Sequence, residues 1–231
     1  MSVYVKDITM LASMVGPDQR LKLSELLSFA QEASIAHTTE LGMGREMTLD
    51  RDLLWVIGRQ RFEIARLPQY DEHVTLASWP GMTMRMLFPR FYELKAGEET
   101  LIRGVAIWGL IKKKSRKMIF ADDYGIKIPA EHQEGELPFP KPLLLPHLRQ
   151  KTTLKATWAN CDLNGHMSNA YYLDFAQSLL PPSFWKSHSV KAVAIDYEKE
   201  IRLGEEVEVA YGRKGNAFYV GSDRFAIKME F

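Results

Sequence analysis

RFEIARLPQYDEHVTL, at residues 61–76, has a counterpart at residues 194–209, AIDYEKEIRLGEEVEV. Each stretch is typical of a strand, a short acidic turn and a second strand, and Val74 in the first matches Val207 in the second. A match between two such distant segments predicts that one structural unit occurs twice in the chain.

The elements around the two stretches follow the same order. Residues 21–44 and 168–180 place small and apolar side chains at helical spacing, and Pro181 and Pro182 end the second run. Segments rich in β-branched and aromatic residues follow each predicted helix. They predict strands at 53–64, 73–79, 84–94 and 100–111, and at 190–201, 206–213 and 217–231, with a further one at 154–158 before the second helix.

One helix and several antiparallel strands, present twice, predict an α+β fold in which each helix is wrapped by a curved antiparallel sheet. A single copy would leave half of its sheet exposed, so pairing the copies buries that face. We expect an N-terminal unit at 1–123, a proline-rich linker at 124–150 and a C-terminal unit at 151–231. The alternative is one α+β domain whose halves resemble each other by accident.

The composition is that of an ordinary globular protein. The 231 residues are 46% hydrophobic and 26% charged, with 30 basic against 29 acidic side chains and a formal charge of +1. We therefore expect neither a nucleic-acid partner nor a membrane span. The only cysteine is Cys161, which excludes an internal disulfide and fits a cytoplasmic setting, and the N-terminal residues resemble neither a signal nor a transit peptide.

Three polar side chains of the turn CDLNGHMSNAYY, residues 161–172, point to chemistry. Asp162, Asn164 and His166 stand at alternate positions, and Ser168 is a good N-cap for the predicted helix. A helix start offers free N–H groups and a positive dipole end, which suit a developing oxyanion. A carboxylate, an amide and a titratable ring beside such a site suit acyl transfer.

Other interpretations of this turn compete with catalysis. Asp and Asn are common turn residues that bond their own backbone, and from the turn alone this interpretation is favoured. A calcium loop would need glycine at its sixth position and glutamate at its twelfth, and neither is present. Cys161 is a poor nucleophile because the charge of Asp162 disfavours its thiolate. We expect no metal and no cofactor.

The stretch DLNGHMSNAYYLDFA, residues 162–176, resembles the D-x-N-x-H-x-x-N-x-x-Y motif of the acyl-acyl carrier protein thioesterases, a double hotdog family. In the segment YEKE, Glu200 stands 34 residues after His166, in the place of that family's catalytic acid. The first half is similar through WVIGRQRFEIARLP, ASWPG, RFYEL and GVAIWGLI. The resemblance therefore extends in order over nearly the whole chain.

This resemblance implies a double hotdog fold that hydrolyses the thioester of fatty acyl-acyl carrier protein. It implies that the catalytic residues all lie in the second half: Asp162, Asn164, His166 and Glu200. The first half would hold the acyl chain. Two departures from the family pattern are Ile201, where some relatives have cysteine, and Lys112, where an acidic residue is usual.

Thioester hydrolysis by these residues has two forms. Either Glu200 activates water, or Asp162 attacks the carbonyl and forms an anhydride; in both, N–H groups near Ser168 and Asn169 would bind the oxyanion. Strict alternation along residues 192–201 places Glu200 on the face opposite Tyr197, which favours a solvent-exposed carboxylate. A catalytic Glu200 therefore requires a bulge or a strand end that redirects it, or a site built on the outer face of the sheet against the other half.

The run KKKSRK is a candidate docking site for an acidic acyl carrier protein with its phosphopantetheine-linked acyl chain, although most such runs are solvated turns. Its basic residues are Lys112, Lys113, Lys114, Arg116 and Lys117. Alternative functions are acyl-CoA hydrolysis and non-catalytic binding of acyl chains or carrier, and a homodimer would be unsurprising. Aromatic and methionine side chains of the first half are candidates for the acyl pocket or for ordinary core: Trp55, Phe62, Trp79, Met82, Met84, Met86 and Phe88.

Overall fold

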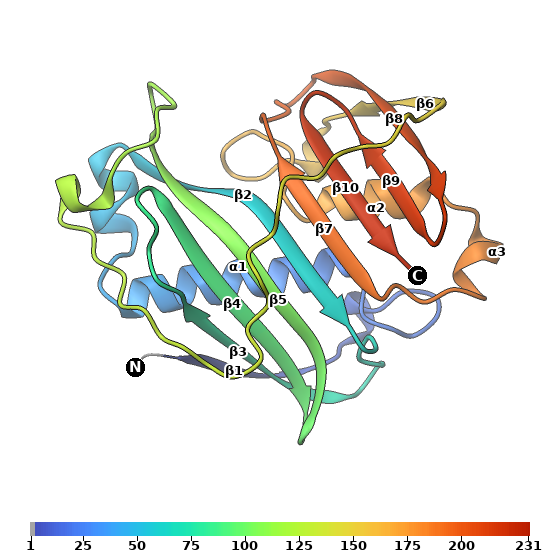
Figure 1. Ribbon diagram of the computed structural model, residues 1–231, viewed down its shortest axis with the longest axis horizontal. Coiled ribbons are helices and arrows are strands. Elements are labelled where there is room, and N and C mark those ends of the chain that lie inside the picture. The colour runs from blue at the N-terminus through green and yellow to red at the C-terminus, as the bar shows by residue number, and fades with distance from the viewer. Residues whose placement is uncertain (1–2) are drawn as a thin grey trace.

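Ten strands form one continuous antiparallel sheet in the computed structural model, which describes residues 3–231 (Figure 1). Their order is β1-β3-β4-β5-β2-β7-β10-β9-β8-β6. The order is symmetric about the centre, because β1 to β5 of the first half correspond in turn to β6 to β10 of the second. This arrangement, with a helix behind each half, confirms the predicted α+β double hotdog fold.

The first half packs α1, Leu23–Glu40, against five strands. Apolar side chains of α1 at three- and four-residue spacing are buried in the main core, while Glu32 and Glu40 remain exposed. The helix ends at Glu40, and Gly42 just beyond it has a φ of 76°, which suits a residue without Cβ. The strands are β1 (Tyr4–Thr9), β2 (Leu53–Ile64), β3 (His73–Pro80), β4 (Leu87–Ala96) and β5 (Glu99–Lys112).

The second half repeats this arrangement on a smaller scale. Its central helix α2, Tyr171–Ser178, is followed by the short α3, Pro182–Trp185. Leu173 and Ala176 of α2 are fully buried against the sheet. The strands are β6 (Gln150–Lys155), β7 (Ala192–Tyr197), β8 (Glu206–Lys214), β9 (Ala217–Gly221) and β10 (Phe225–Glu230).

Several predicted elements differ from the structure in their bounds, and four of these differences lie in the second half. The strand predicted at 217–231 is a hairpin of β9 and β10, and the strand predicted at 154–158 is β6, which ends at Lys155. The predicted helix at 168–180 begins only at Tyr171. Strand β7 ends at Tyr197, before Glu200, and this early end matters for the site.

The two halves meet where β2 pairs with β7, through residues 59–63 of β2. At this seam the Gln60 amide donates to the Tyr197 hydroxyl at 2.8 Å, and that hydroxyl donates to the Asn169 carbonyl at 3.0 Å. Gln60 is buried. The seam therefore joins both halves to the segment just before α2.

Between the 3-10 helix η4, Ala121–Tyr124, and β6, the chain contains neither helix nor strand and crosses the front of the sheet (Figure 1). It is nevertheless anchored. The Leu143 N–H donates to the buried Asp196 carboxylate at 2.7 Å, and Phe139 stacks on Phe91. Residues 125–149 are therefore an ordered connection that packs on the sheet.

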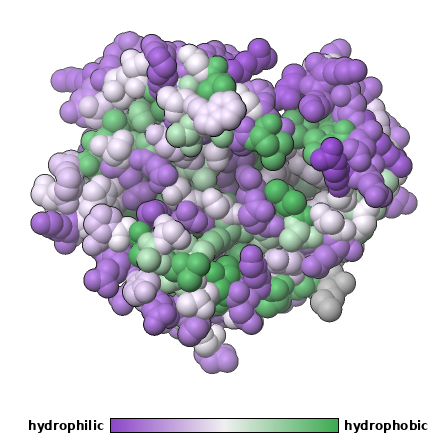
Figure 2. All heavy atoms as spheres, turned by 180° about the vertical axis from the view of Figure 1, so that it is seen from behind, coloured by the Kyte–Doolittle hydropathy of each residue, from purple (hydrophilic) through white to green (hydrophobic). Residues whose placement is uncertain are grey.

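Seen from behind, the face on which the helices lie carries mostly hydrophilic side chains, with hydrophobic ones in separate groups (Figure 2). None of the helices within residues 3–231 is long and apolar enough to cross a membrane.

Candidate active site

The turn at 161–167 is built by its own polar groups. The Asp162 carboxylate accepts the N–H of Asn164 at 2.8 Å and the N–H of His166 at 3.5 Å, while the Asp162 N–H donates to the His166 carbonyl at 2.8 Å. Gly165 has a φ of 75°, a conformation that glycine adopts without strain. Asp162 and Asn164 are exposed, and His166 is half-buried.

Backbone hydrogen bonds hold this turn against the segment that follows β7. The Met167 N–H donates to the Ile201 carbonyl at 2.8 Å, and the Leu203 N–H donates to the Gly165 carbonyl at 3.0 Å. The turn and residues 201–203 therefore lie side by side, although two helices and a strand separate them in the sequence.

Glu200 is redirected by the end of β7. The N–H groups of Glu198 and Lys199 both donate to the Arg224 carbonyl, at 2.8 and 3.0 Å, so two residues oppose one as in a β-bulge. The pair counts as one position, which places Glu200 on the same side as Tyr197. The bulge that a catalytic Glu200 requires is therefore present.

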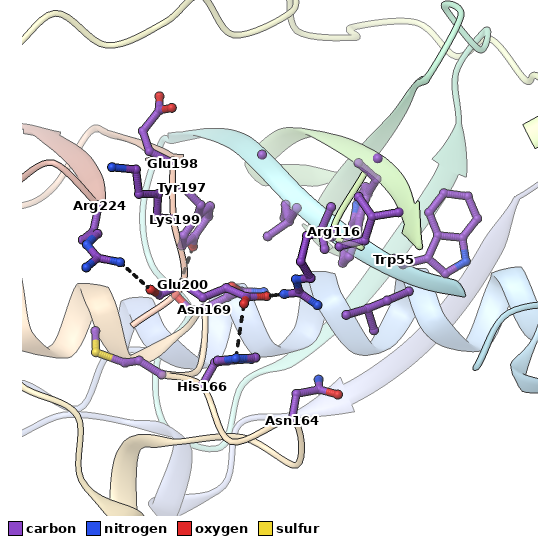
Figure 3. Close-up of a pocket in the computed structure, with 18 of the residues that line it drawn as sticks. Trp55, Arg116, Asn164, His166, Asn169, Tyr197, Glu198, Lys199, Glu200 and Arg224 are labelled. Atoms are coloured by element: carbon purple, nitrogen blue, oxygen red, sulfur yellow. Dashed lines mark hydrogen bonds and ion pairs between the residues drawn. The ribbon is translucent and has the colours of Figure 1, made fainter. Parts of the chain in front are cut away.

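The carboxylate of Glu200 lies between two donors (Figure 3). Its Oε2 lies 3.2 Å from His166 Nε2, and its Oε1 contacts Arg116 Nη2. The Glu200 carbonyl accepts from Arg224 at 3.2 Å. Asn164 lies on the far side of His166 from Glu200, and its amide approaches only Asp162, at 3.5 Å.

Partial burial lowers the pKa of His166, and the nearby guanidinium groups of Arg116 and Arg202 lower it further. Asp162 and Glu205 act in the opposite direction but do not reverse the shift. A neutral ring whose Nε2 faces a carboxylate carries its proton on that nitrogen. Near neutral pH, His166 therefore presents an N–H group toward the Glu200 carboxylate, with Nε2 3.2 Å from Oε2.

The two predicted oxyanion donors, Ser168 and Asn169, differ in whether their backbone N–H groups are already hydrogen-bonded. The Ser168 N–H donates to the Asn160 carbonyl at 2.8 Å, and the cap of α2 is Ala170, with no side-chain cap bond. Ser168 is thus neither a free donor nor the N-cap, and the prediction is wrong for it. Asn169 lines the cavity, and its N–H has no acceptor within residues 3–231.

A cavity of about 1060 Å³ is lined by Asp162, Asn164, His166, Asn169 and Glu200. Strand β2 pairs with β7 only from Arg59 onward, so residues 53–58 extend beyond the seam and form the opposite wall. Among the candidates for the acyl pocket, only Trp55 lines it; the rest of the wall is aliphatic and aromatic. Its apolar members are Leu54, Val56, Ile57, Leu87, Ile107, Trp108, Ile111 and Met118.

Nucleophilic thiol and metal chemistry have no support at this site. Partial burial and the charge of Asp162 raise the pKa of the Cys161 thiol. Residues 3–231 contain no group of three or more side chains that could hold a metal ion.

With this geometry established, comparison with known proteins identifies the family. The model of the acyl-ACP thioesterase N-terminal domain matches residues 2–125, and that of the C-terminal domain matches residues 147–224. The chain belongs to the acyl-ACP thioesterase family.

Two curated relatives of this acyl-ACP thioesterase family member are the following plant proteins. A dodecanoyl-acyl carrier protein hydrolase of Cinnamomum camphora is 24% identical over 217 residues, covering 82% of this chain and 54% of the relative. A palmitoyl-acyl carrier protein thioesterase of Gossypium hirsutum is 25% identical over 222 residues, covering 86% and 52%. The chain thus spans about half the length of the curated relatives that it matches.

Solved structures share the fold of this family member over its whole length. An acyl-ACP thioesterase from Bacteroides thetaiotaomicron superimposes with a TM-score of 0.86 at 18% identity, covering 100% of this chain and 98% of that one. The 12:0-ACP thioesterase of Umbellularia californica gives 0.82 at 20% identity, covering 100% and 97%.

The basic run of this acyl-ACP thioesterase family member is divided between surface and cavity. Lys112, Lys113, Lys114 and Lys117 are exposed, and Arg116 is also exposed, with 36% of its side chain accessible, but its guanidinium in addition lines the cavity at Glu200. Charge clustering alone predicted a surface role for Arg116. Only the path of its loop reveals the contact with Glu200.

Proposed function

We propose that this chain hydrolyses the thioester of fatty acyl-acyl carrier protein to a free fatty acid and the carrier thiol. The main support for this proposal is that Glu200 and His166 meet at one end of a cavity whose other wall is apolar. Polar side chains at one end of the cavity suit a thioester group, and an apolar wall beside them suits its acyl chain. The names of the plant relatives and the family membership support the same substrate class.

In the proposed reaction, Glu200 accepts a proton from a water molecule that attacks the thioester carbonyl. His166, neutral and donating from Nε2, orients the carboxylate, and the free N–H of Asn169 is the available backbone donor for the oxyanion. The intermediate collapses by breaking the carbon–sulfur bond. The leaving thiolate is a good leaving group, since thiols of this kind have pKa values of about 8.5, and it takes up the proton held by Glu200.

Attack by Asp162 is the less favoured form of the mechanism. Its Oδ1 accepts two N–H groups of its own turn, which stabilises the carboxylate and lowers its nucleophilicity. A single turnover in ¹⁸O-labelled water separates the two routes. Direct attack by water labels only the fatty acid, whereas hydrolysis of an anhydride at the protein carbonyl labels Asp162.

The function is tested by mixing the purified chain with acyl-acyl carrier protein and measuring thiol release with a thiol reagent. Glu200→Gln should lower kcat about 10²- to 10⁴-fold, the usual contribution of general base catalysis. Binding of the acyl carrier without thiol release by the wild-type chain would instead support a non-catalytic binding protein. A kcat/KM higher for acyl-CoA than for the carrier substrate would favour the acyl-CoA alternative.

We further propose that the exposed lysines Lys113 and Lys114 attract the acidic carrier. They lie on the loop whose Arg116 enters the cavity, so a carrier docked there would hold its prosthetic arm close to Glu200. Replacing both lysines by Glu should raise KM for the carrier substrate far more than for a short thioester without carrier. Equal effects on both substrates would remove these lysines from carrier binding.

A cytoplasmic location also remains our proposal, on the basis of the single cysteine.

A further inference from the structure

Arg116 reaches the site from the other half of the molecule. It lies in the tight loop after β5, which is closed by hydrogen bonds from the Lys112 N–H to the Lys117 carbonyl at 2.9 Å and from the Arg116 N–H to the Lys112 carbonyl at 2.8 Å. From this loop the guanidinium crosses the cavity to Glu200 (Figure 3). The N-terminal half thus supplies the charged group that contacts Glu200 of the C-terminal half.

The surroundings of Arg116 are otherwise unfavourable for a cation. Partial burial lowers its pKa, and the like charge of Arg202 lowers it further. Its φ of 57° is a conformation that glycine and asparagine adopt more readily than arginine. The contact with the Glu200 carboxylate is the interaction that offsets these costs.

The two ends of the Glu200 carboxylate are held by different halves. His166 holds Oε2 and belongs to the same half as Glu200, whereas Arg116 holds Oε1. One donor alone would leave the carboxylate able to rotate toward solvent, since the Glu200 side chain is 33% exposed. Two donors on opposite oxygens fix its plane.

We propose that Arg116 is a positioning residue for Glu200, so that the site is complete only when both halves contribute. This inference rests on the proposed role of Glu200 in thioester hydrolysis and goes beyond it, because it assigns Arg116 to the reaction rather than to carrier docking. The contact orients the carboxylate for the attacking water and keeps it inside the cavity.

The test compares Arg116→Asn with Ser115→Asn, an exposed neighbour on the same loop. Asparagine tolerates the positive φ of residue 116, so the loop should keep its conformation. Each variant is assayed on acyl-acyl carrier protein and on the same acyl group as an N-acetylcysteamine thioester, which has no carrier. Thermal unfolding checks that the variants remain folded, and Arg116→Lys tests rescue by a second cation.

For Arg116→Asn we expect kcat to fall about tenfold or more on both substrates, with KM on the carrier-free thioester little changed. Arg116→Lys should recover part of this loss, and Ser115→Asn should leave kcat unchanged on both substrates. An effect of Arg116→Asn confined to KM for the carrier substrate would overturn the inference and return Arg116 to carrier docking. Unchanged kinetics on both substrates would also overturn it, while an inactive wild-type chain would overturn the proposed function and this inference together.

A second readout does not depend on turnover. The charged groups that act on His166 are Arg116, Arg202, Asp162, Glu205 and the contacting Glu200. Because Arg116 disfavours the protonated ring, Arg116→Asn should raise the pKa of His166, measured by NMR titration of its ring protons. An unchanged titration would show that the guanidinium does not lie at this site.

Discussion

The hydroxyl of Tyr197 is the point where both halves and the start of the α2 segment meet, so its removal should affect both stability and catalysis. In Tyr197→Phe the ring stays in its place while two hydrogen bonds disappear. The Gln60 amide loses its acceptor at 2.8 Å, and the Asn169 carbonyl loses its donor at 3.0 Å.

The expected loss of stability follows from the burial of these two partners. Gln60 is only 3% exposed, and a buried donor without an acceptor costs about 1–3 kcal/mol. The Asn169 carbonyl is partly buried, and losing an ordinary hydrogen bond there costs about 0.5–1.5 kcal/mol. Together they lower the free energy of unfolding by about 2–4 kcal/mol, which in a chain of this size lowers Tm by roughly 5–15 °C.

The assay is thermal unfolding followed by circular dichroism, together with kcat on the carrier-free thioester. We expect kcat to fall about tenfold, because the Asn169 N–H is no longer held at the cavity wall. Tyr219→Phe is the matched control, since the Tyr219 hydroxyl has no hydrogen bond to another residue in the described part of the chain, and its Tm should stay close to wild type. A Tyr197→Phe variant with the Tm of wild type would refute the reasoning.

Three further perturbations test other parts of the structure. Folding lowers the pKa of His166 below its ordinary 6.5, so as the pH falls the unfolded chain takes up a proton on this ring before the folded chain does. The free energy of unfolding should therefore fall as the pH drops below about 6.5, and it should fall less in His166→Gln. Urea unfolding at several pH values measures both. Asp196→Ala removes the acceptor of the Leu143 N–H, which should cost about 2 kcal/mol and speed proteolysis within residues 125–149; an unchanged cleavage rate would argue against the anchor. Gly104→Ala places a methyl group 2.3 Å from the Phe62 ring and should cost about 1–3 kcal/mol in urea unfolding, so a neutral effect would contradict the packing.

Much of the fold follows from local pattern, and the exceptions have local causes. The strand predicted at 53–64 coincides with β2 because its β-branched and aromatic residues are bounded by clear turns. β1, which had no prediction, is an edge strand with three exposed residues in a row, so it shows no alternation. The turn at 222–224 contains neither Gly nor Pro and therefore did not divide β9 from β10 in the prediction.

The site was harder to predict because its geometry depends on residues far away in the sequence. Asp162, Asn164 and His166 follow from one turn, but their meeting with Glu200 requires the bulge opposite Arg224. Nothing in the sequence of residues 192–201 marks that bulge, since it is defined by the partner strand. The sequence marked Arg116 only as one member of a basic run. The contact with Glu200 that distinguishes it from its lysine neighbours depends on the tertiary structure.

Two irregularities at the seam explain why a symmetric fold has an open cavity there. The register of β2 against β5 shifts at Gly58, one residue before its pairing with β7 begins. The chain is bulged at Glu198 and Lys199, directly after the end of β7. Because a bulge bends its strand, the central strands separate from this point instead of remaining paired. The overhanging part of β2 then forms the apolar wall, and the chain beyond β7 carries Glu200 along the other wall. The same separation opens the cavity and turns the Glu200 carboxylate toward it, so the irregularities at the seam account for both features.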